Sequence, residues 1–176
     1  QVDEALATGK YDLVTVTHNE TSVGIMNPIK EIAEVVKKYP DVVFCVDTVS
    51  SMGGTSIPVD ELGIDFCITS TQKCLGCPPG MSVASVSKKA YERAKTVPNR
   101  GLYLDIVEIY DKVVKDDKYQ YPSTPSESHM FALQEELTYM LEEEGLENRY
   151  ARHLEMAEYI RAWARKYFAI FSDERY

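Results

Sequence analysis

Two side chains that could act together on a carbonyl compound each follow an apolar stretch of the sequence. Asp47 ends the run VVFCVD, and Lys73 follows the run DFCITS inside the segment DFCITSTQKCLGCPPG. An amine that is kept away from water has a lowered pKa and becomes nucleophilic, as the formation of a Schiff base requires. A carboxylate at the end of a buried strand needs a cationic partner to remain charged. This acid and this lysine suggest a carbonyl cofactor with a basic ring nitrogen, which describes pyridoxal phosphate.

Each of these residues also has an ordinary structural explanation. Asp47 could cap the turn that follows its strand, and Lys73 could be a strand-end lysine whose stem covers apolar surface. The neighbouring Cys74 and Cys77 form a CxxC pair, which can bind zinc or carry out thiol redox chemistry. The other two cysteines lie inside expected strands, so we favour two small thiols in a turn and expect no metal site. The following CPPG turn is expected to stiffen the backbone after Lys73.

The histidines are further candidates for acid–base chemistry. His18 could be a base or a hydrogen-bonded residue at a strand end, and we favour the structural role. His129 and His153 lie in expected helices without a partner pattern, so surface or core placement is favoured over ligation.

The hydrophobic pattern predicts an α/β fold with a mostly parallel sheet and flanking helices, followed by a long helical arm. Short apolar runs rich in β-branched residues predict strands at residues 12–18, 42–47, 65–70 and 81–87. Between the first two strands, Asn27 can cap a helix, Pro28 can occupy its first position, and Pro40 bars its continuation. Strand, helix and strand in this order predict a βαβ unit.

The strand ends predict where a ligand would bind, because open parallel sheets bind ligands beyond the carboxyl ends of their strands. Residues 18–22, 47–51 and 70–73 are expected to meet at one edge, and the fourth strand ends near residues 85–87. The first three segments contribute an acid, hydroxyls, an amide and a lysine.

The second half of the chain is expected to be helical. Periodic apolar residues predict helices at residues 88–95, 102–115, 129–144 and 146–168, with Gly145 as the break between the last two. The acidic run LQEELTYMLEEEGLE is interpreted as a solvated helix face. The residues of this run that are expected to face inward are Leu133, Leu137, Met140 and Leu141.

Composition excludes several classes of function. The chain has 176 residues, of which 44% are hydrophobic, enough for one domain with a core. A net charge of −9 repels a phosphate backbone, so no nucleic-acid partner is expected. No apolar run has the length of a membrane span, and no signal-peptide pattern is present, so no membrane partner is expected. Four cysteines without a disulfide framework fit a reducing cytoplasm.

Both ends of the sequence suggest a piece of a longer protein. The first residues, QVDEALATGKYD, have the pattern of the tail of a helix that ends at Gly9, and the last, RKYFAIFSDERY, that of the opening of a further unit. We therefore expect this chain to be a central fragment.

Four segments carry a resemblance to a known family: THNETSVGIMNPI, VDTVSSMGG, GIDFCITSTQKCLGCPPG and YPSTPS. Together they resemble class V (fold-type I) pyridoxal-phosphate aminotransferases, especially the alanine–glyoxylate and serine–pyruvate branch. The order and spacing of the segments match over almost the whole chain. The resemblance implies transamination between an amino acid of the alanine or serine type and a 2-oxo acid, glyoxylate or pyruvate. It also implies a partial large domain at residues 1–145, and a linking helix with the start of a small domain at residues 146–176.

Carried over position by position, the resemblance implies specific roles around the cofactor ring. Lys73 matches the lysine that forms the Schiff base, and Asp47 matches the acid paired with the pyridinium nitrogen. Val49 matches the residue packed under the ring, and Thr21 occupies the hydroxyl position near the phenolic oxygen. Gln72 matches a glutamine that contacts the cofactor.

The YPSTPS segment implies a second subunit. Tyr121 and Thr124 match a pair that reaches the phosphate in the neighbouring subunit, which implies a homodimer with shared active sites. The family's glycine-containing phosphate loop and ring-stacking aromatic would lie before Gln1, and its carboxylate-binding arginine would lie beyond Tyr176. The chain alone is therefore expected to be inactive. Two departures, Asn19 in place of Gly and Val23 in place of Thr, are not expected to remove a cofactor contact.

Other interpretations remain open. Cysteine desulfurases share the fold but have a histidine where this chain has Gln72, and they need a nucleophilic cysteine on a later loop. Aminoethylphosphonate transaminases share the ET, G and NPI blocks but have asparagine before the lysine. In a different class, the chain could be a non-catalytic binding or assembly piece, or only a stable non-catalytic remnant.

Overall fold

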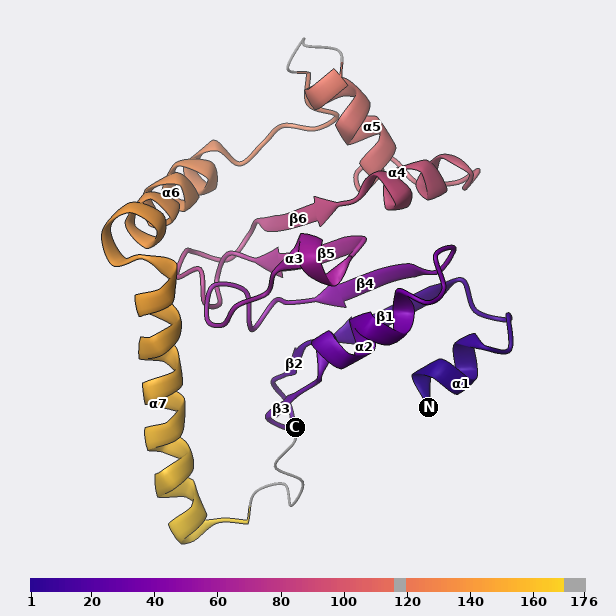
Figure 1. Ribbon diagram of the computed structural model, residues 1–176. Coiled ribbons are helices and arrows are strands. Elements are labelled where there is room, and N and C mark those ends of the chain that lie inside the picture. The colour runs from indigo at the N-terminus through magenta and orange to yellow at the C-terminus, as the bar shows by residue number, and fades with distance from the viewer. Residues whose placement is uncertain (116–119, 170–176) are drawn as a thin grey trace.

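A four-stranded sheet forms the centre of the computed structural model, which describes residues 1–115 and 120–169 (Figure 1). The strands lie in the order β1-β4-β5-β6. Their bounds are β1 (Leu13–Thr17), β4 (Val43–Asp47), β5 (Phe66–Ser70) and β6 (Ser82–Val86). Strands β1, β4 and β5 are parallel, and β6 is antiparallel to β5. The mostly parallel sheet and the four strands predicted from apolar runs are confirmed.

The direction of β6 corrects one expectation about the sheet edge. In its pairing with β5, Ser82 lies opposite Ser70 and Val86 lies opposite Phe66. The end of β6 near residues 85–87 therefore lies at the sheet edge opposite to Asp47. Parallel strands need a long crossover, usually a helix, whereas β5 and β6 are joined by a turn that returns the chain directly.

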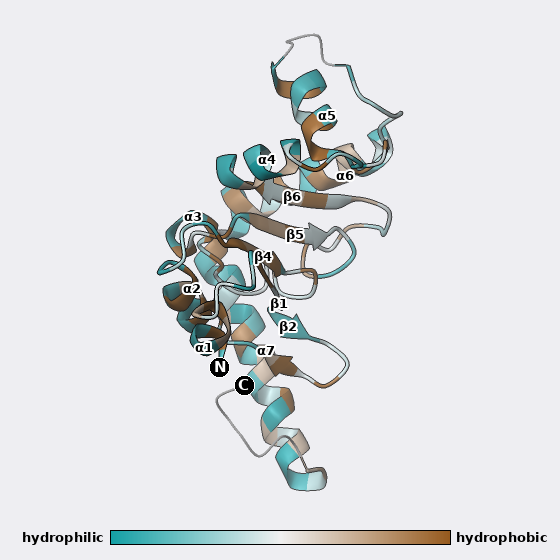
Figure 2. Ribbon diagram, turned by 90° about the vertical axis from the view of Figure 1, so that its right-hand side faces the viewer, coloured by the Kyte–Doolittle hydropathy of each residue, from teal (hydrophilic) through white to brown (hydrophobic). Residues whose placement is uncertain are grey.

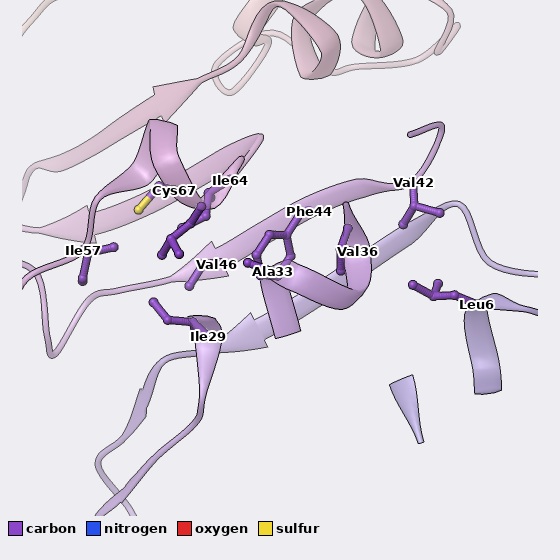
Figure 3. Packing of buried hydrophobic residues seen from close by; sticks show 11 residues of the cluster. Leu6, Ile29, Ala33, Val36, Val42, Phe44, Val46, Ile57, Ile64 and Cys67 are labelled. Atoms are coloured by element: carbon purple, nitrogen blue, oxygen red, sulfur yellow. The ribbon is translucent and has the colours of Figure 1, made fainter. Parts of the chain in front are cut away.

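The predicted βαβ unit is formed by β1, helix α2 (Ile29–Val36) and β4. Ile29, Ala33 and Val36 of the helix are buried against Phe44 and Val46 of β4 (Figure 3). Because the buried helix residues recur at helical spacing, the burial of one helix face explains why this segment is a helix. The helix ends before Pro40, as expected.

The start of α2 differs from the prediction. Pro28 takes the N-cap position, and no side chain caps the helix. The side-chain amide of Asn27 instead donates a hydrogen bond to the carbonyl oxygen of Thr17 at 2.8 Å. Asn27 therefore ties the start of the crossover to the end of β1.

Three short elements, two strands and one helix, carry no periodic pattern and were not predicted from sequence. Strands β2 (Asn19–Glu20) and β3 (Ile25–Met26) form a small antiparallel hairpin after β1. Helix α3 (Val59–Leu62) lies between β4 and β5, and α1 (Val2–Leu6) is the helix expected before Gly9. Helices α1, α2 and α3 lie on the same side of the strands in Figure 2.

The helical second half is confirmed with changed boundaries. Its elements are α4 (Lys88–Lys95), α5 (Ile106–Tyr110), the π-helical η1 (Asp111–Lys115), α6 (Glu127–Thr138), the π-helical η2 (Tyr139–Glu144) and α7 (Leu146–Tyr167). The helix expected from residue 102 begins at Ile106, because the Asp105 carboxylate caps it by accepting the N–H of Val107 at 3.0 Å. Gly145, at φ 77°, separates η2 from α7 as predicted.

The expected inward face of the acidic helix is partly wrong. Met140 is buried at 2% exposure, and Leu133 and Leu137 are half-buried, but Leu141 is 57% exposed. Residues 139–144 form a π-helix, whose wider turn changes the side-chain period. The α-helical spacing used to place Leu141 therefore no longer applies.

The two faces of the sheet differ. On the face covered by α2, Phe44, Val46 and Cys67 belong to the main hydrophobic core. The opposite face has a shallow hollow of about 210 Å³ whose lining includes Thr15, Cys45, Asp47 and Ile68. Alternate residues of β4 therefore point either into the core or into this open hollow.

Helix α7 extends along and beyond one end of the sheet (Figure 1). Arg149 is the buried residue of this helix. Residues 170–176, the last part of the segment RKYFAIFSDERY that the sequence suggests as the opening of a further unit, lie outside the described residues, as do residues 118 and 119 of the expected loop. Over residues 1–115 and 120–169, no helix is both long enough and apolar enough to cross a membrane.

Asp65 links β4, β5 and α4. The residue is 5% exposed, and Oδ2 accepts the backbone N–H of Phe44 at 2.9 Å. Oδ1 accepts the hydroxyl of Ser87 at 2.7 Å, and the Lys89 ammonium lies 2.7 Å from Oδ2.

We expect Asp65→Ala to lower the free energy of unfolding by about 2–3 kcal/mol, because the buried Phe44 N–H would lose its extra acceptor and Ser87 and Lys89 would lose a partner. Asp41→Ala, at an exposed position before β4, is the control and should change stability by less than about 0.5 kcal/mol. Urea unfolding of the chain measures both, and equal losses in the two variants would contradict the prediction.

Candidate active site

The candidate site lies where the parallel strands end. Thr17 of β1 lies opposite Asp47 of β4, which in turn lies opposite Ile68 of β5. The segments that follow these strands therefore begin at one edge of the sheet. Two of them matter most and are called here the β4 loop (residues 48–54) and the β5 loop (residues 71–80).

Hydrogen bonds connect the end of β1 to the β4 loop. His18 Nδ1 is hydrogen-bonded to Ser51 Oγ at 3.0 Å. Asn19 donates its side-chain amide to Ser50 Oγ at 3.2 Å, and the Ser50 hydroxyl donates to the carbonyl oxygen of Asn19 at 2.7 Å. His18 is buried, and this burial lowers its pKa. The favoured interpretation of His18 as a hydrogen-bonded structural residue is confirmed.

The β4 and β5 loops touch directly. The Cys74 thiol donates to the carbonyl oxygen of Ser50 at 3.6 Å. A Cβ atom added at Gly54 would lie 2.9 Å from the Cys74 sulfur, and one added at Gly53 would lie 3.3 Å from Cδ2 of Leu75. Gly53 also has φ +87°, a conformation that favours glycine. The glycine pair of VDTVSSMGG therefore permits this close approach.

Arg149 of α7 spans the same contact. Its Nε donates to the carbonyl oxygen of Gly53 at 3.2 Å, and its NH2 group donates to the carbonyl oxygen of Cys74 at 2.7 Å. Sequence reasoning missed this residue, because the acidic run before it was interpreted as a solvated face. The sequence did offer one signal for it. Three consecutive glutamates and Gly145 directly precede the helix, and Arg149 lies in its first turn, where it can pair with these carboxylates.

Asp47 is the last residue of β4, and its side chain is exposed. Its Oδ1 accepts the backbone N–H of Val49 at 2.8 Å, so the turn-capping explanation is confirmed as part of its role. Within the described residues no donor reaches its Oδ2. The expected desolvation of this carboxylate is absent here, because Asp47 borders the open face of the sheet.

Lys73 lies in the β5 loop, and its side chain is also exposed, contrary to the expectation of an amine kept away from water. The backbone on both sides is well held. The Gly76 N–H donates to the carbonyl oxygen of Lys73 at 2.9 Å, and the Cys77 N–H donates to that of Thr71 at 2.9 Å. Thr71 Oγ1 donates to the carbonyl oxygen of Pro78 at 2.7 Å. The expected stiff turn after Lys73 is confirmed.

The other sequence-predicted residues divide into two groups. Val49, half-buried, and Gln72, exposed, lie on the β4 and β5 loops with Asp47 and Lys73. Thr21 is exposed in the turn of the β2–β3 hairpin.

Tyr121 and Thr124 lie outside this cluster. They belong to residues 120–126 before α6, where Ser126 Oγ is hydrogen-bonded to His129 Nδ1 at 2.6 Å, and His129 Nε2 is hydrogen-bonded to the Pro79 carbonyl oxygen of the β5 loop at 2.9 Å. Both are exposed, and Tyr121 has 47% of its surface accessible.

The CxxC pair has the properties of structural thiols. Cys74 and Cys77 are free, and the Cys77 thiol lies 3.7 Å from the carbonyl oxygen of Ala132 on α6. Burial raises the pKa of both thiols, which disfavours the reactive thiolate. In the described part of the chain, no group of three or more His, Cys, Asp or Glu residues could hold a metal ion.

The chemistry of this edge fits a cofactor that carries an aldehyde and a basic ring nitrogen. It offers an amine at Lys73, a carboxylate oxygen at Asp47 and an amide at Gln72. In addition, the hydroxyl of Ser70, at the end of β5, is buried and has no hydrogen-bond partner among the described residues. A buried hydroxyl without a partner is costly, so this edge can accommodate one more polar group.

Comparison with known proteins gives consistent results. Residues 1–167 match the family model described as Aminotransferase class-V. An uncharacterized aminotransferase of Methanocaldococcus jannaschii is 50% identical over 157 residues, which is 87% of this chain and 40% of that protein. A 2-aminoethylphosphonate–pyruvate transaminase of Lysinibacillus sphaericus is 37% identical over 140 residues, which is 80% of this chain and 37% of that protein.

A solved structure shares the fold. The crystal structure of an alanine–glyoxylate aminotransferase from Nostoc sp. superimposes with a TM-score of 0.85 and 29% sequence identity. The match covers 94% of this chain and 43% of the Nostoc chain. The chain thus spans about 40% of the length of the curated relatives that it matches.

We expect Gly54→Ala to lower the free energy of unfolding by about 1–3 kcal/mol, because the new methyl group would overlap the Cys74 sulfur. Cys74→Ala removes that sulfur and leaves the Cys74 Cβ at an ordinary 3.5 Å from the added methyl. The cost of Gly54→Ala should therefore be smaller by about 1 kcal/mol or more in the Cys74→Ala background. Urea unfolding of the four proteins measures this coupling, and strictly additive effects would argue against the loop contact.

We expect His18 to make the stability of the chain depend on pH. Because burial holds its pKa below the ordinary value of 6.5, protonation favours the unfolded state. The stability due to neutral His18 is fully present above pH 6.5 and is lost as the pH falls from there toward the folded-state pKa. His18→Asn keeps a polar group near Ser51 but does not titrate. Unfolding free energies measured from about pH 7 to about pH 5 should fall less steeply in this variant, and parallel curves would refute the assignment.

Proposed function

The chain belongs to the class-V aminotransferase family, and we propose that the protein carrying it transfers an amino group from an amino acid to a 2-oxo acid with pyridoxal 5′-phosphate. The observation that carries this proposal is the placement of Asp47 at the end of β4 and of Lys73 on the β5 loop, because β4 and β5 are adjacent parallel strands and the loops that follow them are in contact. The order of the residues around them, with Gln72 before the lysine, supports it further.

The proposed chemistry assigns a separate task to each side chain. When bound, the cofactor supplies an aldehyde that condenses with amines and a ring that takes up electrons. Lys73 would supply the amine for covalent attachment, and its Nζ would take the proton from the Cα of the substrate and deliver it to the former aldehyde carbon of the cofactor. Asp47 uses the oxygen not engaged by Val49 to keep a proton on the ring nitrogen.

The remaining candidates act as binding groups in this proposal. Val49 packs under the ring, and Thr21 and Gln72 supply polar contacts. Tyr121 and Thr124 serve the phosphate in a second subunit, so the proposal includes a homodimer with shared active sites. The exposure of Tyr121 supports a role outside its own subunit's site.

The exposure of Lys73 and Asp47 bears on where the activity resides. Proton transfer at a lysine and electron uptake by a ring both benefit from the exclusion of water. The chain spans about 40% of the length of its relatives, and it leaves the face of the sheet beside Asp47 open. We therefore assign the activity to the longer protein and expect this segment alone to be inactive.

The substrates proposed are alanine or serine as amino donor, and glyoxylate or pyruvate as acceptor. The likeness to the Nostoc alanine–glyoxylate aminotransferase supports this choice. A second candidate, 2-aminoethylphosphonate with pyruvate, is favoured by the Lysinibacillus relative. A cytoplasmic location is proposed because the four cysteines are free thiols.

We expect borohydride reduction of the full-length protein with pyridoxal phosphate to leave the cofactor attached to Lys73. Lys73→Ala should abolish this adduct and lower transamination by at least about 100-fold. Lys30→Ala, at an exposed position of α2, is the control and should change neither. Peptide mass spectrometry locates the adduct, and an adduct and turnover that persist in Lys73→Ala would overturn the proposal. The same protein, given each donor with each acceptor, decides between the two substrate pairs by their rates.

A further inference from the structure

Arg149 is buried where four parts of the molecule meet. The residue is 5% exposed, although it lies in the first turn of α7. Besides its bonds to the Gly53 and Cys74 carbonyl oxygens, its NH1 group lies 2.8 Å from Glu144 Oε2, and its NH2 group lies 3.0 Å from Glu136 Oε1. One guanidinium thus contacts the β4 loop, the β5 loop, α6 and η2.

The two carbonyl groups that Arg149 binds lie close in sequence to the two proposed reacting groups. Cys74 directly follows Lys73, and Gly53 lies in the loop that begins after Asp47. The two loops are already in contact through Gly54 and Cys74. A single rigid group bound to both loops restrains the distance between their backbones, and with it the separation of the backbone at Lys73 from that at Asp47.

The carboxylates hold the guanidinium in one orientation. A buried guanidinium needs charged partners, and here Glu136 and Glu144 supply them from the helical half of the chain. Hydrogen bonding to Arg152, and then to Arg149, holds the pKa of Glu144 below its usual range. Because the planar guanidinium is paired with two carboxylates, its remaining N–H groups point toward the carbonyl oxygens of the two loops.

We infer that Arg149 is a positioning residue for the proposed transamination, which sets the geometry between Lys73 and Asp47 by binding the backbone of both loops. This inference rests on the proposed function. The helical half of the chain thereby affects the geometry of the sheet edge, because α7 provides the arginine and α6 and η2 provide the carboxylates that orient the guanidinium.

Arg149→Lys tests the inference with the full-length protein. Lysine keeps the positive charge but has a single ammonium group, which cannot bind two carbonyls and two carboxylates in the geometry of the fork. Arg152→Lys is the matched control, because Arg152 lies on the same helix and pairs with Glu144 at 2.7 Å, but within the described part of the chain it makes no hydrogen bond to either loop. The readouts are the rate at which borohydride traps pyridoxal phosphate on Lys73, the separate values of kcat and KM, and the pH dependence of the cofactor absorbance.

We expect Arg149→Lys to slow trapping on Lys73 on the order of 10-fold and to lower kcat with little change in the KM of the amino donor, because small displacements of reacting groups cost rate. The pH dependence of the cofactor absorbance should also shift. Arg152→Lys should stay within about twofold of the wild type in each readout. If Arg149→Lys behaves like Arg152→Lys, the inference is overturned.

Two further measurements separate the other outcomes. If the wild-type protein shows no trapping on Lys73, the proposed function fails and the inference fails with it, whereas normal trapping in Arg149→Lys overturns the inference alone. Hydrogen exchange of residues 43–47 reports whether Arg149→Lys keeps the fold. If that protection is lost, Glu136→Gln decides, because it keeps Arg149 and removes one orienting charge. Slower trapping in Glu136→Gln supports the inference, and an unchanged rate overturns it.

Discussion

The contact between the β4 and β5 loops is the constraint on which the candidate site depends. Parallel pairing brings the ends of β4 and β5 together, but it leaves open how the following loops pack. Gly54 allows the Cys74 side chain to approach its backbone, and the Cys74 thiol binds the Ser50 carbonyl. The glycines and the small thiol side chain therefore together allow close packing of the segments that follow Asp47 and carry Lys73.

The buried guanidinium of Arg149 connects this contact to the helical half of the chain. A buried ion pair is weak evidence for stability, because desolvation of the charges offsets much of their attraction. Its effect on geometry is larger, since a planar group with several bonds permits few arrangements of its partners. Helices α6 and α7 therefore contribute side chains that contact the loops at the sheet edge.

The open face of the sheet explains why Asp47 is exposed. Phe44 and Val46 alternate with Cys45 and Asp47 along β4, so one set is buried under α2 while the other lines the shallow hollow. The backbone around Lys73 is held by the turn that follows it. The site thus has an ordered framework, whereas the chain itself does not exclude water from it.

The sequence by itself determined the four strands, the βαβ unit, the break at Gly145 and the gathering of Asp47 and Lys73 at one sheet edge, because these follow from local apolar patterns and strand order. Residue motifs also identified the family. Only the tertiary structure decided the direction of β6, the use of Asn27 as a tie to β1, the outward turn of Leu141 and the burial of Arg149 between two loops. Each of these depends on which groups meet in space, and the partners of Arg149 lie as far away as Gly53, on another element. Local sequence patterns contain no information on contacts between residues that are distant in the chain, so these contacts become visible only in the folded structure.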